Sequence, residues 1–191
     1  MTMDDIDITL MLGVKAGDIQ CFEQLFAKHQ KSVLNVIYRY VGNAHLAEDL
    51  TQETFFRVYK ARESYQADAK FTTYLYRIVT NLCINELKRR KPLYSLDSSP
   101  EHTDNIPAPE LHSTEDPELT QRVKAVIAGL LPNQRMAVVL NKYEKLSYQE
   151  IAERMDISVK AVKSLLARAR TNIKEQLEPY INPVRDIQGK L

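Results

Sequence analysis

The sequence predicts an all-α protein, with two small helical domains joined by a flexible acidic linker. Three observations support this fold class. Apolar residues recur at three- and four-residue intervals in several separate segments, as they do along one face of a helix. The chain of 191 residues holds only 5 glycines, and no alternating strand pattern is visible. Five prolines fall within residues 92–117, a polar stretch with too little apolar content to form a core.

The distribution of charged residues also changes at both ends of this proline-rich stretch. Residues 1–90 carry 12 lysines and arginines against 11 acids, and residues 91–117 carry one lysine against six acids. Residues 118–191 carry 13 basic residues against 8 acids. An acidic segment therefore separates a neutral block from a basic one. The predicted organisation is a first domain at 1–91, a linker at 92–117, a second domain at 118–178 and a C-terminal tail at 179–191.

Apolar spacing and end signals define the expected helices. Gly42 favours the end of the first one, and the basic run 88–91 suits the last turn of the third. Pro132 is well placed in the first turn of a helix. The expected helices run from about Phe22 to Tyr40, from 47 to 62, from 71 to 91 and from 118 to 129, followed by one that opens at Pro132 and by two shorter ones.

The C-terminal part carries the pattern of a helix-turn-helix. Ser147 followed by Glu150 is a capping box that starts a short helix. Asp156-Ile157-Ser158 makes a tight turn, and Ser158 is placed to cap the next helix. A helix, a short turn and a second helix at this spacing are typical of DNA-binding proteins.

The second helix of this motif has two distinct faces. At about 100° per residue, Leu166, Ala169 and Ile173 fall within about 40° of Val162. The opposite side is cationic and small-polar, and every formal charge from 160 to 174 is positive. We expect this side to enter a DNA major groove. The residues expected to reach base edges are Lys163, Ser164, Ala167 and Arg168, and those expected to hold phosphates are Lys160, Arg170 and Lys174. Ser158, at the start of this helix, is also expected to bind DNA.

Three motif segments lie in order on either side of the predicted linker. They are AEDLTQETFFRVY at 47–59, FTTYLYRIVTNLCINELKRRK at 71–91, and the stretch 131–170 that contains the helix-turn-helix. With these segments the chain resembles the extracytoplasmic-function (ECF) group of the sigma-70 family of RNA polymerase sigma factors, over about residues 15–178. The resemblance implies that the first domain binds the polymerase clamp and the promoter −10 element. It also implies that the second binds the −35 element and the polymerase flap.

Acidic and amide side chains gather on one side of the second expected helix. Glu48, Asp49, Gln52 and Glu53 recur at i, i+1, i+4 and i+5, so they form a patch able to pair with a basic surface. The resemblance implies that the clamp helices of core polymerase dock here. Without the resemblance, the same residues are also typical of a solvated helix face.

The third expected helix carries a polar stripe. The stripe consists of Arg77, Asn81, Asn85 and Lys88. Tyr65 and Tyr74 lie beside it, whereas Phe71 and Leu75 are expected in the core. Aromatic rings next to amide and cationic donors suit an unpaired base, and stacking contributes about 1–3 kcal/mol per base. The resemblance implies that this helix and residues 64–72 capture a base flipped from the −10 element, which melts DNA without chemical catalysis.

The chain departs from the family pattern at a few positions. Lys160 stands where a glycine is common, and Leu165 stands where an arginine is common. We therefore expect its promoter preference to differ from that of familiar members. Tyr74 stands where a tryptophan is common.

Several function classes are disfavoured. The sequence shows no catalytic constellation, no glycine-rich phosphate loop and no metal-ligand spacing, so neither an enzyme nor a cofactor is expected. Cys21 and Cys83 lack ligand spacing and are expected to be ordinary buried thiols in a reducing cytosol. The acidic N-terminus is unlike a signal peptide, and no apolar stretch approaches the ~18 residues that span a bilayer. A cytoplasmic protein without membrane insertion is expected.

Two other interpretations remain open. A helix-turn-helix repressor or activator would act on DNA without polymerase, and it would need a ligand pocket or a dimer face in the first domain. An adaptor would work mainly by binding another protein, and it would tolerate changes at Lys163 and Arg168. The resemblance also implies a cognate anti-sigma factor, for which the sequence shows no site.

Overall fold

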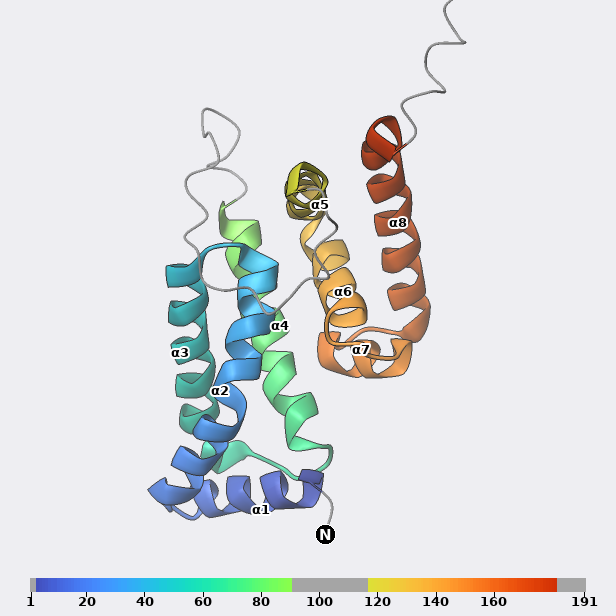
Figure 1. Cartoon of the computed structure of the whole chain (residues 1–191). Helices are drawn as coiled ribbons and strands as arrows, with labels where there is room; N and C mark the ends of the chain where they lie inside the picture. The colour runs from blue at the N-terminus through green and yellow to red at the C-terminus, as the bar shows by residue number, and fades with distance from the viewer. Residues whose placement is uncertain (1–2, 91–116, 182–191) are drawn as a thin grey trace, which may run out of the picture.

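A computed structural model of the chain describes residues 3–90 and 117–181, and within these ranges it contains helices and no strand. Figure 1 shows the helices in chain order. The predicted flexible linker at 92–117 lies outside the described residues except for its last position, and the tail lies outside them beyond 181. The elements are α1 Met3–Lys15, α2 Ile19–Val41, α3 Ala44–Lys60, the 3₁₀ turn η1 Arg62–Ser64, α4 Phe71–Arg90, α5 Pro117–Gly129, α6 Pro132–Lys142, α7 Tyr148–Met155 and α8 Val159–Ile181.

The ends of α2 and α3 follow the signals in the sequence. Asp18 caps α2, since its carboxylate accepts hydrogen bonds from the backbone N–H groups of Gln20 and Cys21. Gly42 ends α2 at φ 75°, a left-handed conformation in which glycine is not strained. Asn43 then caps α3 through the N–H of Leu46 at 2.8 Å. The all-α prediction and the expected helix bounds are confirmed here to within a few residues.

Helix α1 was not predicted. It crosses the N-terminal ends of α2 and α4 (Figure 1). Its side chains Met11 and Val14 are completely or almost completely buried. At its end, the Lys15 ammonium donates to the backbone carbonyl of Tyr65 at 2.8 Å. The helix therefore completes the N-terminal core and supports the segment that leads into α4.

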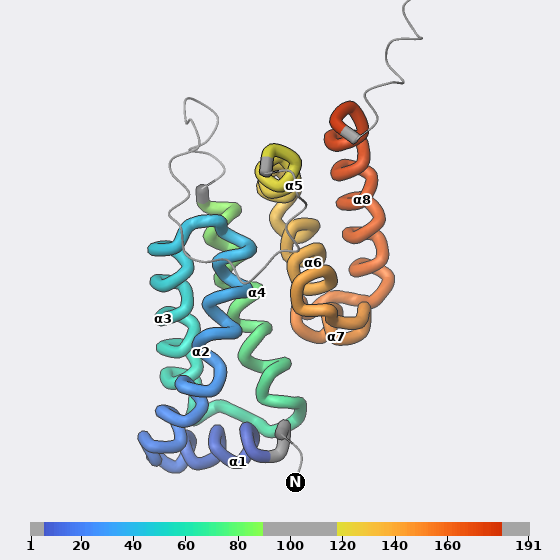
Figure 2. The backbone as a smooth tube through the Cα atoms, in the orientation of Figure 1, coloured from blue at the N-terminus to red at the C-terminus, as the bar shows by residue number. Residues whose placement is uncertain are grey.

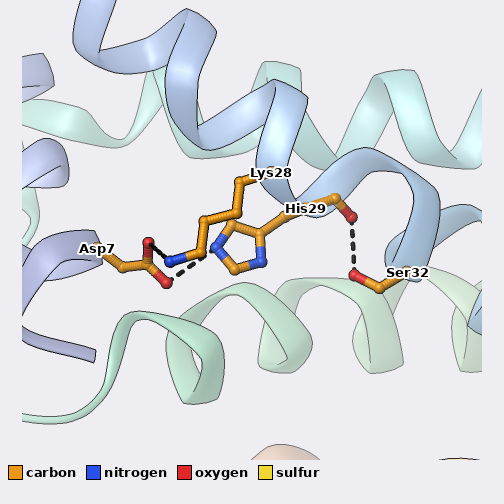
Figure 3. Close-up of polar contacts among 4 residues, drawn as sticks. All are labelled: Asp7, Lys28, His29 and Ser32. Carbon is orange, nitrogen blue, oxygen red and sulfur yellow. Dashed lines mark hydrogen bonds and ion pairs between the residues drawn. The ribbon is translucent and has the colours of Figure 1, made fainter. Parts of the chain in front are cut away.

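A buried polar cluster fastens α1 to α2 (Figure 3). The Asp7 carboxylate is 3% exposed and accepts from the Lys28 ammonium at 2.6 Å and from His29 Nε2 at 3.0 Å. The Ser32 hydroxyl donates to the His29 carbonyl at 2.9 Å. The His29 ring also packs against Phe71, with ring centroids 5.4 Å apart. A buried carboxylate with two donors is satisfied, so α1 is held at one position on α2.

The buried His29 predicts a pH-dependent stability. Burial lowers the pKa of His29, and this outweighs the opposing effect of the Asp7 carboxylate, so the folded protein keeps the ring neutral. The unfolded chain then binds more protons below pH ~6.5. The free energy of unfolding should fall as pH drops from ~6.5 towards the lower folded pKa, by at most about 1.4 kcal/mol per pH unit.

Urea unfolding of the wild type and of His29→Gln between pH 5 and 8 measures this effect. The glutamine amide can still donate to Asp7 but does not titrate. The slope attributed to His29 should therefore be missing from the variant. An unchanged slope in the variant would place the dependence on other groups.

The C-terminal helices form a second bundle. Ser147 and Glu150 make the predicted capping box at the start of α7, which confirms it. Asp156 ends α7 at φ 55°, and the Ser158 hydroxyl accepts from the N–H of Ala161 at 3.2 Å. Helix α8 is 23 residues long, although a shorter helix was expected. Its extension to Ile181 carries Tyr180 under the guanidinium of Arg122 on α5, 3.9 Å from the ring centre, so contact with α5 favours the longer helix.

The two bundles pack against each other. Figure 2 shows the backbone of α6 and α7 running beside α4, and contacts join α4 to both helices and α2 to α6. The core is continuous across this boundary, since Tyr40 of α2 and Met136 of α6 are both fully buried. Periodicity within single helices did not predict this packing, because it depends on residues far apart in the sequence.

Candidate nucleic-acid and partner interfaces

Helix α8 has the two faces that the sequence predicted. Val162, Leu166 and Ala169 are buried against the rest of the C-terminal bundle. The predicted DNA-reading residues all lie on the exposed side. They are Ser158, Lys160, Lys163, Ser164, Ala167, Arg168, Arg170 and Lys174. This face combines exposed cations with small side chains, which allows close approach to a groove. Contact of each residue with DNA stays a prediction.

The polar stripe on α4 is also exposed. Arg77, Asn81, Asn85 and Lys88 lie on the solvent side, while Leu75 and Val79 of the same helix are fully buried. Arg77 differs from the other three residues because its guanidinium pairs with the Asp156 carboxylate at 3.2 Å. One member of the stripe therefore touches the turn of the helix-turn-helix.

The two tyrosines beside the stripe are largely covered. Tyr65 is 2% exposed and packs edge-on against Tyr74, with ring centroids 5.1 Å apart. Within the described residues, neither hydroxyl has a hydrogen-bond partner. Burial raises the pKa of both hydroxyls. The Tyr65 ring is therefore covered in this conformation, and the bond from Lys15 to its carbonyl holds its backbone beside α1. A role of either ring in base stacking stays a prediction.

The acidic patch lies on the outer side of α3. Glu48, Asp49 and Gln52 are exposed. Glu53 is partly covered, because the Arg57 side chain donates to its carboxylate at 2.6 Å. The structure therefore brings the four predicted residues together on one helix face.

An apolar groove continues this face, and sequence reasoning missed it. It runs between α2 and α3 and is lined by Ile19, Phe22, Phe56 and Tyr59, among others, with Gln52 at its polar edge. Phe56 is 59% exposed, a large fraction for a phenylalanine. A signal was available in the spacing, since Gln52, Phe56 and Tyr59 recur at four and three residues.

The described residues give no sign of a metal centre or a membrane span. Within 3–90 and 117–181 no three His, Cys, Asp or Glu side chains gather as metal ligands. None of the helices in those ranges is long and apolar enough to cross a bilayer. Cys83 is fully buried as expected, and burial raises its thiol pKa to about 12. Cys21 is only half-buried, and its thiol donates to Asp18 at 3.4 Å.

Comparison with known proteins accounts for both bundles. Two family models match, "Sigma-70 region 2" over residues 25–92 and "Sigma-70, region 4" over residues 120–173. The ECF RNA polymerase sigma factor SigW of Bacillus subtilis is 33% identical, over 86% of this chain and 92% of its own length. The chain belongs to the ECF group of the sigma-70 family. Members of this family are non-enzymatic transcription initiation factors.

Further relatives agree with this assignment. The ECF RNA polymerase sigma-E factor of Escherichia coli K12 is 35% identical, over 92% of this sigma factor and 96% of its own length. Among solved structures, CnrH in complex with the cytosolic domain of CnrY has a TM-score of 0.65 at 22% identity, covering 91% of this chain and 97% of its own. The sigma factor RpoE in complex with the anti-sigma factor NepR from Bartonella quintana has a TM-score of 0.58 at 18% identity, covering 82% and 96%. These two structures are similar in fold.

Proposed function

We propose that this sigma factor binds core RNA polymerase through α3, recognises the −10 element through α4 and the −35 element through α8, and opens promoter DNA. One observation carries the proposal. The same chain presents an exposed cationic helix of a helix-turn-helix and, on a different bundle, an acidic face that continues into an apolar groove. A repressor that acts on DNA alone would use the groove only as a dimer face or a ligand pocket, and neither use accounts for the acidic residues that continue it.

The α3 surface supports docking of the polymerase clamp helices. Glu48 and Asp49 supply negative charge at one end, and Phe56 and Tyr59 supply apolar area at the other. A helical partner with basic residues near an apolar ridge would fill both parts. Exposed aromatic side chains in a groove are frequent sites of high binding energy, with charged neighbours that set orientation.

The α4 surface supports strand opening. The stripe from Arg77 to Lys88 offers amide and cationic donors along about three helical turns. Single-stranded DNA is bound by such donors together with stacking rings. The binding energy of the open strand would offset unstacking, which costs a few kcal/mol per step. No covalent chemistry is needed.

An anti-sigma factor is the proposed regulator, and the cytoplasm is the proposed location. Two solved structures of the same fold contain a bound second protein: CnrH is in complex with the cytosolic domain of CnrY, and the sigma factor RpoE is in complex with the anti-sigma factor NepR. Purification of the tagged protein from native cells should recover a second regulatory chain besides polymerase. Recovery of polymerase alone would count against this part.

Run-off transcription with sigma-free core polymerase and a genomic promoter library tests the main proposal. The wild type should give discrete transcripts. Glu53→Lys, which reverses a charge in the acidic patch, and Lys163→Ala, which removes a cation from α8, should each reduce them about tenfold or more. Glu63→Lys changes an exposed acid outside the patch and serves as the control. Binding to duplex DNA without any engagement of core would instead establish the repressor interpretation.

A further inference from the structure

Helix α1 holds the first residue of the connection between η1 and α4. Tyr65 follows η1 with an extended backbone, at φ −61° and ψ 133°. The ammonium of Lys15, the last residue of α1, donates to the Tyr65 carbonyl at 2.8 Å. The Tyr65 N–H donates to the carbonyl of Arg62 at 3.3 Å. Both polar groups of the Tyr65 backbone are therefore bound, and the direction in which the chain leaves η1 is fixed.

The same helix also supports the other end of this connection. Phe71, the first residue of α4, is fully buried, and its ring packs on the ring of His29 with centroids 5.4 Å apart. His29 in turn contacts the Asp7 carboxylate of α1 at 3.0 Å (Figure 3). In Figure 1 the chain from η1 to α4 runs along α1. One end is therefore held directly by Lys15, and the other is held through His29.

The residues between the two ends face solvent. Tyr65 and Phe71 are buried, whereas every residue from 66 to 70 is exposed and outside regular helix. These exposed residues are Gln66, Ala67, Asp68, Ala69 and Lys70. Exposed loops whose ends are fixed on a rigid scaffold are frequent binding elements, because the scaffold sets their conformation before the ligand arrives. We call residues 66–70 the presented loop.

Two unpaired hydroxyl groups lie at the base of the presented loop. The Tyr65 and Tyr74 hydroxyls are buried, and neither has a hydrogen-bond partner in the part of the chain that the structure describes. A buried polar group without a partner destabilises the fold, so other contacts must hold these rings in place. The edge-on contact of the two rings, with centroids 5.1 Å apart, stabilises the side chains. The bond from Lys15 stabilises the Tyr65 backbone.

Lys15 is suited to positioning the loop without being part of the core. Its side chain is exposed, so its removal leaves no cavity and the fold should survive substitution. Its ammonium is bound to a neutral carbonyl, and such charge-assisted bonds are stronger than neutral ones. The competing role for an exposed lysine in a DNA-binding protein is contact with a phosphate, which has a different signature in binding experiments.

We propose that Lys15 is a positioning residue for recognition of the −10 element. By fixing the backbone at Tyr65, it holds the presented loop in the conformation that receives an unpaired base, and it does not bind the DNA itself. This inference rests on the proposed recognition of the −10 element by this sigma factor. A loop that is ordered before binding loses less conformational entropy when the base enters.

Binding of polymerase holoenzyme to single-stranded −10 oligonucleotides tests this role. The strand is taken from a promoter found by run-off transcription, and each position is replaced in turn by the other three bases. Lys15→Met removes the donor and keeps a long side chain. At the captured position the variant should lose about three- to tenfold of the wild type's base preference, because a base that is not captured gains nothing from the loop. Lys15→Arg, which can still donate, should restore most of the preference.

The salt dependence of the same binding separates positioning from phosphate contact. With a positioning role, the slope of log affinity against log salt is the same for Lys15→Met and wild type. A phosphate contact would instead weaken all oligonucleotides alike and reduce the slope by about 0.7, and that result would overturn the proposal. Lys31→Met removes the same charge from an exposed position of α2 and is the control. An equal loss of base preference in the control would also overturn it.

Amide hydrogen exchange of the free protein tests the support of the loop without DNA. The N–H groups of Tyr65 and Thr73 are hydrogen bonded to the carbonyls of Arg62 and Lys70, at the two ends of the loop. In Lys15→Met the Tyr65 amide should exchange about threefold faster or more, because its local structure opens more often. Amides in the middle of α3 and the thermal midpoint should be unchanged. Equal exchange at Tyr65 in variant and wild type would show that Lys15 does not hold this backbone.

These outcomes are distinguishable from failure of the proposed function. If wild-type holoenzyme shows no base preference at any position of the −10 strand, the proposed recognition of that element is wrong, and the positioning role falls with it. If the wild type discriminates and Lys15→Met discriminates equally well, the sigma function stands and Lys15 has no positioning role.

Discussion

Replacement of Phe56 by alanine is expected to weaken binding to core polymerase by roughly 30- to 1000-fold. The ring is 59% exposed in the groove between α2 and α3, so the free protein gains little from it. Aromatic anchors that fill a partner's pocket contribute about 2–4 kcal/mol to binding, which corresponds to that range of affinity. The fold should be nearly unaffected, since alanine is the best helix former.

Titration of core polymerase into fluorescently labelled protein measures this effect, and thermal unfolding checks the fold. Leu12→Ala truncates an apolar side chain that is 45% exposed on α1, outside the groove, and is the control. Equal affinity of Phe56→Ala and wild type would show that the groove is not part of the polymerase interface. A comparable loss with Leu12→Ala would point to a general effect on the fold.

Substitution on the exposed face of α8 is expected to separate base reading from phosphate binding. Lys163→Ala and Arg168→Ala should each cost about 1–3 kcal/mol on the correct −35 sequence, or roughly 5- to 150-fold, and should reduce discrimination against a scrambled one. Lys160→Ala and Lys174→Ala should weaken both sequences alike. Each of these phosphate variants should also reduce the slope of log affinity against log salt by about 0.9.

Binding of polymerase holoenzyme to promoter fragments at several salt concentrations provides these quantities. Glu175→Gln changes an exposed acid on the same helix and is the control. If all four cationic variants lost affinity uniformly, with no change in discrimination, the helix would hold only the DNA backbone. The assignment of Lys163 and Arg168 to base edges would then be wrong.

The helices could be predicted because their information is local. The apolar face of α8 and the capping box at Ser147 each depend on residues within a few turns. Helix α1 could not be predicted in the same way. Its Asp7 is buried only because Lys28 and His29, three turns into the next helix, are there to satisfy it. The local pattern of the first residues shows only an acidic segment, and it does not indicate that the segment packs as a helix against α2.

The candidate sites were predictable in part for a similar reason. The cationic face of α8 and the stripe on α4 follow from helical angles alone. The burial of Tyr65 does not, since it depends on Lys15 and on Tyr74. Phe56 could have been separated from its buried neighbour Phe55 by angle, because the two point about 100° apart on α3. The exposed Phe56 ring lines a groove only because residues of α2 pack beside it, and that packing cannot be read from α3 alone.

The Asp156 carboxylate and a DNA phosphate would compete for the same guanidinium, that of Arg77. The side chains of Arg77 and Asp156 are 49% and 69% exposed, so the pair contributes little to stability and is easily exchanged. With α4 packed beside α7, the Asp156 carboxylate pairs with the guanidinium that we propose for contact with the −10 strand. Added salt weakens the attraction to DNA and the attraction to Asp156 together. The ratio between Arg77 paired with Asp156 and Arg77 bound to a promoter phosphate should therefore change less with ionic strength than either interaction alone.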